Sequence, residues 1–360
     1  MPALKPYYNI EYNSKDVTTD VTPFVLSVNY TDRVSGQSDE IEVVFDDTDG
    51  RWSNQWYPAK GDRLVVRMGY ENDHFGCGTF IVDEFEFSGP PDQFSIRGIA
   101  TGANRSVRTK KSTAHESKSL KQIARAVAQA LGLTLVWDAK DIQLERSTQY
   151  QETDLGFLNR IANDYGMAFS IRDDRMTFYS LYDLEAAAPV LQLSRADVSR
   201  VSVRVKTVGT ASKAKVVHHN QKTGKVVQRE YQGDGASNSD GIPFEQIVAA
   251  DEHVVHSRTE NVAQADMKAK AAYHRANSRE VTGTLTAFGS PRLLAGVNFE
   301  LIGYGEMSAK YHITESSHSI SRDAGYTVGL SFKKVGTVTP AQKRRADEYA
   351  PVPQTIIEEL

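Results

Sequence analysis

The chain has little of several features that mark particular classes of protein. It holds one cysteine, Cys77, in 360 residues, so no disulfide can form within it. No run of about 18 apolar residues occurs, which excludes a membrane-spanning helix on sequence grounds. The N-terminus, "MPALKPYYNIEYN", lacks the apolar core of a signal peptide. We therefore expect a soluble protein that is made in the cytoplasm.

Motifs for catalysis and for cofactors are also missing. "EHVVH" (Glu252–His256) spaces its histidines at i, i+3, whereas a metal-binding helix places them at i, i+4. His218 and His219 are neighbours in a strand pattern and so point to opposite faces. The GxGxxG, GxxxxGK[ST] and GxSxG spacings do not occur. The sequence predicts no catalytic residue, no metal site and no cofactor, although a carboxylate pair distant in sequence stays open.

The chain as a whole has no large excess of positive or negative charge, but one segment does. The formal net charge of −4 gives no general attraction to nucleic acid or to anionic membranes. One segment departs from this balance, because residues 206–229 contain no Asp or Glu. Its basic side chains are Lys206, Lys213, Lys215, Lys222, Lys225 and Arg229. They form either a solvated hairpin face or a surface that meets a polyanion or an acidic partner.

What is present first is a β pattern over residues 1–105. "EIEVVF" places Ile41, Val43 and Phe45 on one face of a half-buried strand. Further alternating runs follow at Asp62–Tyr70, Gly78–Phe87 and Gln93–Ala100, separated by Gly, Pro and Asp turns. Short strands at this spacing are typical of a barrel or a sandwich.

Residues 106–190 change to a helical pattern. "SLKQIARAVAQALGL" carries an apolar stripe, with Ser119 as the expected N-cap and Gly132 as the expected C-terminal stop. A second helix should begin after Thr153 and end at Gly166. "MAFSI" and "RMTFYS" then predict a hairpin with a turn at "RDD". This region should form an α/β domain with two helices and a hairpin.

Residues 191–335 return to β alternation, with a hairpin turning near "KTGK", a loop at Gly233–Gly241 and a helix near residues 263–278. "AKGDRLVVRMGY" (Ala59–Tyr70) resembles "LAGVNFELIGYG" (Leu294–Gly305), and similar strands follow each in the same order. We predict a duplicated β domain with an α/β insert. Residues 336–360 should form an extended C-terminal tail that meets a neighbouring subunit.

The run "ETDLGFLNRIANDYGMAFSIRDDRMTFYS" resembles the helix–hairpin of the phage late control D family. These proteins are baseplate hubs of contractile tails and are related to the hub part of type VI secretion spike proteins. The residues that carry the resemblance are Phe157, Leu158, Arg160, Ala162, Gly166 and Phe169. The likeness extends upstream to "SLKQIARAVAQALGL" and "KGDRLVVRMGY", and downstream to "AGVNFELIGYGEMSAKYHITESSHSI".

The resemblance implies an α+β fold with two tail-tube-like antiparallel β-barrels and an α/β helix–hairpin insert between them. It further implies a homotrimer whose six barrels give a pseudo-six-fold ring between a hexameric tail tube and a central spike. The spike should be a separate polypeptide, because this chain shows no needle segment. The expected location is the virion baseplate, assembled in the host cytoplasm. The lysine-rich hairpin is then expected to line a channel for DNA or a tape-measure protein.

Two alternatives remain open from the sequence. A host carbohydrate-binding tail module would need exposed aromatic platforms, which the 16 tyrosines permit although many lie in strand alternation. A tail-associated peptidoglycan hydrolase would need clustered carboxylates in a cleft. The sequence favours a structural protein over an enzyme, because no such cluster is indicated.

Overall fold

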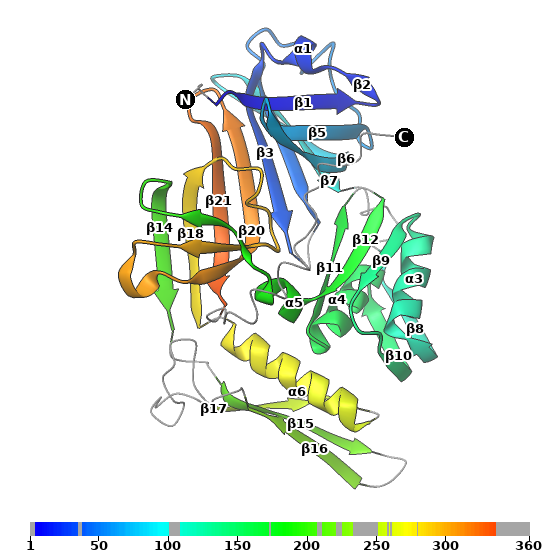
Figure 1. The fold of residues 1–360 in the computed structure, drawn as a ribbon. Helices are drawn as coiled ribbons and strands as arrows, with labels where there is room; N and C mark the ends of the chain where they lie inside the picture. The colour runs from blue at the N-terminus through cyan, green and yellow to red at the C-terminus, as the bar shows by residue number, and fades with distance from the viewer. Residues whose placement is uncertain are drawn as a thin grey trace.

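The computed structural model describes residues 4–34, 38–100, 109–172, 174–206, 211–220, 225–232, 251–257, 259, 261–278 and 280–335. Figure 1 shows two β units side by side, a helix–hairpin module beside them, and a long helix over a small sheet at the bottom. The first β unit spans residues 6–100, and the second combines residues 189–205 with residues 281–334. The helix–hairpin module covers residues 111–186.

The helical elements are α1 (Thr18–Val21), α3 (Leu120–Ala130), α4 (Asp154–Asp164), α5 (Leu181–Ala186), α6 (Val262–Asn277) and the 3-10 turn η2 (Gly305–Met307). The strands of the first β unit are β1 (Pro6–Tyr12), β2 (Lys15–Asp16), β3 (Val25–Arg33), β4 (Glu40–Asp46), β5 (Arg63–Tyr70), β6 (Asp73–Ser88) and β7 (Gln93–Ala100). Those of the helix–hairpin module are β8 (Lys111–Ser119), β9 (Thr134–Asp138), β10 (Gln143–Glu152), β11 (Met167–Arg172) and β12 (Arg175–Ser180).

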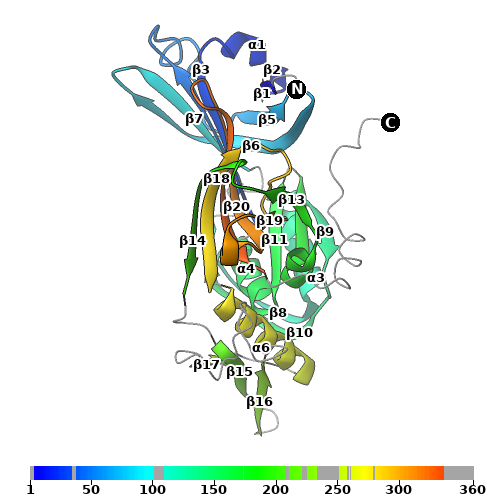
Figure 2. The same cartoon turned by 60° about the vertical axis from the view of Figure 1, so that its left-hand side comes forward.

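The second β unit contributes β13 (Pro189–Leu193), β14 (Val198–Val205), β18 (Val281–Phe288), β19 (Asn298–Leu301), β20 (Lys310–Ser321) and β21 (Gly325–Lys334). Between β14 and β18 lie β15 (Ala211–Asn220), β16 (Lys225–Tyr231) and β17 (Asp251–His256). These three strands form their own sheet, in the order β16–β15–β17, and α6 packs on it. Figure 2 shows this layer at the far end of the molecule from the first β unit.

The helices begin where local chemistry predicts. The Ser119 hydroxyl accepts a hydrogen bond from the Gln122 amide, and the Gln122 side chain accepts one from the Ser119 amide, a reciprocal cap for α3. The Thr153 hydroxyl caps α4 by accepting from the Gly156 amide. Gly132 and Gly166 follow these helices with φ of +72° and +69°, the left-handed conformation that favours glycine. The expected helix starts and stops are confirmed.

The large sheet differs from the expected pair of closed barrels. Over the described ranges, one path runs β14–β18–β21–β20–β3–β4–β7–β6–β5–β1–β2, with β13 and β19 attached beside it. β20 and β3 join the two β units edge to edge, so both belong to one open sheet. The mostly β architecture is confirmed, but the pairing shows no closure of either unit into a barrel.

Three hydrophobic cores stabilise these parts. One lies in the first β unit and includes Ile41, Met68 and Phe80. A second lies in the helix–hairpin module, and a third lies in the second β unit around Phe299 and Phe332. Within the described residues no helix is long and apolar enough to cross a membrane. Lys222, the loop Gly233–Gly241 and the tail 336–360 lie outside the residues that the structure describes.

Candidate assembly site

The two β units repeat the same strand order, as the sequence predicts. In the order of hydrogen-bonded neighbours, the first unit has β3–β4–β7–β6–β5, and the second has the corresponding order β14–β18–β21–β20–β19. The strands also follow one another along the chain in the same sequence. "AKGDRLVVRMGY" contributes β5 and "LAGVNFELIGYG" contributes β19, so the predicted internal repeat is confirmed.

The correspondence extends to single residues, because β-bulges occur at matching places. β3 shifts register between Val25 and Ser27, and β14 does so between Val198 and Arg200. Likewise β6 shifts between Val82 and Glu84, and β20 between Ile313 and Glu315. The bulges of β3 and β14 give one alignment of β7 with β21, and the bulges of β6 and β20 independently give the same alignment. The two units are therefore equivalent position by position.

The junction between β20 and β3, which we call the internal seam, joins residues almost 300 positions apart. It is antiparallel and runs from the Glu315–Arg33 pair to the Ser321–Ser27 pair. On the solvent face, Arg33 Nε lies 2.9 Å from Glu315 Oε2. Also on that face, the Ser319 hydroxyl donates to Asn29 Oδ1 at 2.7 Å. The opposite face of the seam is buried and polar.

Arg172, the last residue of β11, reaches into this buried face from the helix–hairpin module. Its guanidinium lies 3.0 Å from Asp32 Oδ1 and donates to the Tyr30 hydroxyl at 3.2 Å. Tyr30 in turn donates to Asp39 Oδ2 at 3.1 Å. The "RDD" stretch predicts only a turn, so sequence analysis missed this contact. Arg172 thus fixes the module to the first β unit. Asp32 also accepts a hydrogen bond from the Ala295 amide at 2.9 Å, which links this contact to the second β unit.

The charges at the internal seam perturb one another. Burial, reinforced by the neighbouring Asp32 carboxylate, raises the pKa of Asp39 to about 7, although Arg172 acts against this. Burial and the same carboxylates raise the pKa of Tyr30 well above its usual range. Next to them, buried His318 contacts the Tyr326 hydroxyl at 2.7 Å and the Ser316 hydroxyl at 3.0 Å. Burial lowers the pKa of His318 to about 3.

A second polar junction surrounds Glu185 in α5. Its Oε2 lies 2.7 Å from His274 Nε2 of α6, and its Oε1 lies 2.6 Å from Lys333 Nζ of β21. Lys310 donates to the backbone oxygen of Glu185 at 2.6 Å. The junction therefore ties the end of the module, the α6 layer and the second β unit together.

The charged groups of this second junction stabilise the ionised form of the Glu185 carboxylate. Burial by itself raises the pKa of Glu185, but His274 and Lys333 outweigh it and lower the pKa to about 2. Burial lowers the pKa of Lys310 to about 8, and Glu185 opposes this. Nothing in the sequence singled out Glu185, because its partners are more than 80 residues away.

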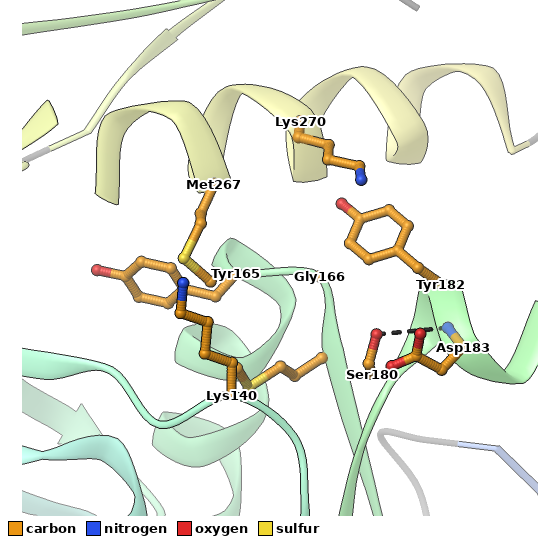
Figure 3. Close-up of a pocket in the computed structure, with 9 residues that line it drawn as sticks. Lys140, Tyr165, Gly166, Ser180, Tyr182, Asp183, Met267 and Lys270 are labelled. Carbon is orange, nitrogen blue, oxygen red and sulfur yellow. Dashed lines mark hydrogen bonds between the residues drawn. The ribbon is translucent and has the colours of Figure 1, made fainter. Parts of the chain in front are cut away.

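A pocket of about 230 Å³ lies between the module and α6. Figure 3 shows Tyr182 beside Lys270, and Tyr165 beside Met267, across this gap. Lys270 Nζ lies 4.6 Å from the centre of the Tyr182 ring, a cation–π contact. The described residues contain no group of three or more His, Cys, Asp or Glu side chains that could hold a metal. The pocket is thus a gap between packed elements, lined by amines and rings.

Residues 103–324, more than half of the chain, match the profile of the phage tail baseplate hub family, GPD. The chain belongs to this family. A probable baseplate hub protein of Escherichia phage 186 is 26% identical over 205 residues, which is 55% of this chain and 52% of that protein. The chain spans about half the length of the curated relatives it matches.

Solved structures resemble the fold of this baseplate hub family member. A tail protein from Neisseria meningitidis MC58 superposes with a TM-score of 0.69 at 14% identity, over 93% of this chain and 98% of that one. An Escherichia coli component of the type VI secretion system has a TM-score of 0.53 at 12% identity, over 86% of this chain and 73% of its own. At such identities the likeness concerns the fold alone.

The residues that suggested the family lie in the helix–hairpin module. Phe157, Leu158 and Ala162 are fully buried in α4, and Phe169 is buried in β11. Arg160 is instead exposed and pairs with Glu152 at 2.9 Å. These residues form the core and the rim of the module, so their pattern reflects packing.

Three of the basic side chains that the structure describes, Lys213, Lys215 and Arg229, lie next to acidic residues. Lys213 and Lys215 lie within 3.7 Å of Glu230 and Glu252, which belong to the two strands that flank β15. Arg229 lies 3.6 Å from Asp266 of α6. Lys206 is exposed directly after β14, and Lys225 begins β16. The acidic partners reduce the positive charge that the sequence run suggests.

Proposed function

We propose that this chain is a structural baseplate hub of a contractile, P2-like phage tail or of a related injection particle. Three copies form a ring in which six equivalent β units surround an axis. One face of the ring seats on a hexameric tail tube, and the other holds a separate central spike. The chain works by symmetric assembly in the virion baseplate, and catalysis is no part of the proposal.

The residue-by-residue equivalence of the two β units carries this proposal. A trimer of chains with a single β unit would offer three contacts to a six-fold partner, whereas two units per chain offer six. The shared bulges of β3 with β14 and of β6 with β20 support this, because bulges set strand bend and twist. Two units of matched curvature can occupy equivalent places in one ring.

The remaining parts have supporting roles in the proposal. Each β unit serves as one tube-like segment, and the helix–hairpin module, held by Arg172 and Glu185, braces the two units and docks other baseplate subunits. The ring encloses a passage for DNA or a tape-measure protein. That Lys206, Lys213, Lys215, Lys222, Lys225 and Arg229 face this passage stays a prediction. The carbohydrate-binding and peptidoglycan-hydrolase alternatives gain no specific support from the site.

The experiment is the solution mass of the purified full-length chain, measured by light scattering and by native mass spectrometry with and without the spike and tube proteins. A trimer of the 39.9 kDa chain that binds both partners is the expected result. A stable dimer, or a monomer that fails to assemble even with both partners, would contradict the ring.

A further inference from the structure

Among the strands of the large sheet, β14 and the end of β6 each have one edge with no strand beside it in the part of the chain that the structure describes. β14 pairs with β18 on one side alone. β6 pairs with β5 as far as Ile81, and its last seven residues have β7 on one side and no strand on the other. Unpaired edges expose a row of N–H and C=O groups that can pair with another chain. We call these the β6 edge (residues 84–88) and the β14 edge (residues 202–206).

Because the two β units are equivalent, each of the two edges has a counterpart strand in the internal seam. β20 is equivalent to β6, and β3 is equivalent to β14, and these two strands are the ones that form the internal seam. From the bulges, Glu84 matches Glu315 and Ser88 matches Ser319. By the same count, Ser202 matches Asn29. The chain thus contains one completed seam and the two separated halves of a second.

We propose that the β6 edge of one copy pairs antiparallel with the β14 edge of the next copy, in the register of the internal seam. This register sets Glu84 opposite Lys206, Glu86 opposite Arg204 and Ser88 opposite Ser202. On the other face, Phe85 meets Val205 and Phe87 meets Val203. The partner is a second copy of this chain, and the contact deepens and rests on the proposed ring.

Charge complementarity supports this register. In the internal seam, Glu315 pairs with Arg33, and the matching positions on the two free edges hold Glu84 and Lys206, again an acid and a base. The next pair on the same face of the internal seam is Ser317 with Thr31, and the equivalent positions on the free edges hold Glu86 and Arg204. Opposite charges directly across an antiparallel pair are favourable, and a slip by one residue removes both pairs.

Burial supports it as well. His318 is fully buried in the internal seam, whereas Phe87, its equivalent on the β6 edge, is 54% exposed. Asp32 is 3% exposed, whereas Val205, its equivalent on the β14 edge, is 49% exposed. In the internal seam these positions are buried, but on the free edges they hold large apolar side chains that are exposed. Such an exposed apolar surface indicates an interaction site.

The contact joins two different edges, so it is head to tail and produces either a closed ring or an open filament. With two equivalent units per chain, closure at three copies gives six seams of one kind, three within chains and three between them. Figure 1 shows β14 at one side of the molecule and β6 at the other, as such a ring requires.

The test exchanges charges in the full-length chain. Glu86→Arg and Arg204→Glu each place like charges across the proposed contact, and we expect each to raise the concentration at which half the trimer dissociates by about tenfold. The double variant restores opposite charges and should return within about threefold of wild type. Sedimentation velocity over a dilution series measures this.

Cysteine pairs fix the register independently. Under oxidation, Ser88→Cys with Ser202→Cys should link copies into covalent dimers and trimers and nothing larger. Ser88→Cys with Arg200→Cys, shifted by two residues on the same face, should link far less. As a positive control, Asn29→Cys with Ser319→Cys, the equivalent internal pair, should close within one chain. The natural Cys77 is buried and should not interfere.

The outcomes separate this inference from the proposed function. A wild-type trimer that ignores both charge reversals and gives no Ser88–Ser202 link would overturn the β6–β14 contact and leave the hub proposal standing. Bands larger than a trimer would overturn ring closure. A wild-type chain that never forms a trimer, even with tube and spike, would overturn both.

Discussion

The internal seam and the two free edges occupy equivalent positions of one repeated unit but differ in chemistry. The buried face of the internal seam carries Tyr30, Asp32 and His318, whereas the same positions on the free edges hold Val203, Val205 and Phe87. Polar groups buried in one chain can be satisfied by a fixed partner, here Arg172. The free edges carry apolar groups instead, and burying such groups in a contact is favourable without an exact hydrogen-bonding partner.

The difference indicates how one fold serves two purposes. A buried network satisfied on all sides rigidifies a joint and specifies its geometry, but it is costly when one member is missing. Inside the chain all members are always present. Between chains they are not, and hydrophobic contacts with opposite charges at the rim suit an assembly step better.

The largest expected effect comes from removing the cation of the internal seam. Arg172→Ala leaves Asp32 and Asp39 buried without their positive partner and should lower the free energy of unfolding by about 4 kcal/mol. Chemical denaturation of the full-length chain measures this. Arg175→Ala, in the same hairpin but with its side chain 59% exposed, is the control and should cost less than about 0.5 kcal/mol. Equal losses would show that the network does not hold the seam.

Equivalent positions should respond differently to the same change. His318→Ala removes a buried ring and its contacts to Tyr326 and Ser316, so it should cost about 3 kcal/mol of unfolding free energy. Phe87→Ala, at the matching place on the β6 edge, should change the monomer's stability by less than about 0.5 kcal/mol yet weaken the trimer. Thermal and chemical unfolding of dilute protein, beside a mass measurement at high concentration, distinguishes the two. A large stability loss from Phe87→Ala would erase the contrast.

The internal seam should also respond to pH. The pKa of Asp39 is raised to about 7 in the fold, above roughly 3.9 in an unfolded chain. Its stabilising contribution is therefore complete below about pH 4 and is lost as pH rises through 7. Relative to Asp39→Asn, wild type should lose about 3 kcal/mol of unfolding free energy between about pH 4.5 and 7.5. A difference that stays constant over this range contradicts the prediction.

The smallest expected effect concerns a cross-strand pair of a glycine and a large residue that occurs in both β units, with the two residues on opposite strands. The first unit sets Gly98 opposite Ile41, whereas the second sets Phe332 opposite Gly283, so glycine and large residue have changed strands. A Cβ on Gly283 would lie 2.5 Å from Phe332 Cζ and from the Ser202 oxygen. Gly283→Ala should therefore cost about 1.5 kcal/mol by overpacking.

Gly76→Ala is the matched control for that substitution. Its Cβ would meet nothing within 4 Å, and the residue is exposed in β6. We expect a change within about 0.5 kcal/mol in the same denaturation experiment. If both substitutions cost the same, loss of glycine itself would be the cause, and packing would not.

The sequence by itself determined the local elements and their repetition. Ser119, Thr153, Gly132 and Gly166 mark helix ends because capping depends on residues a few positions away. The alternation of β5 with β6, and of β19 with β20, was visible because side chains on a strand alternate with period two. The helix–hairpin pattern at Phe157 and Phe169 indicated the family for the same reason.

Only the tertiary structure decided how distant segments meet. Arg172 was predicted to lie in a turn, yet it forms an ion pair with Asp32 of β3, 140 residues earlier in the chain. The lysine run reads as basic, yet Glu230 and Glu252 lie beside Lys213 and Lys215 across strand pairs that no local rule predicts. The two expected barrels became one open sheet, because strand pairing joins backbone groups without regard to sequence distance. Local order was therefore readable from neighbours, while the seam and the free edges depended on contacts almost 300 residues apart.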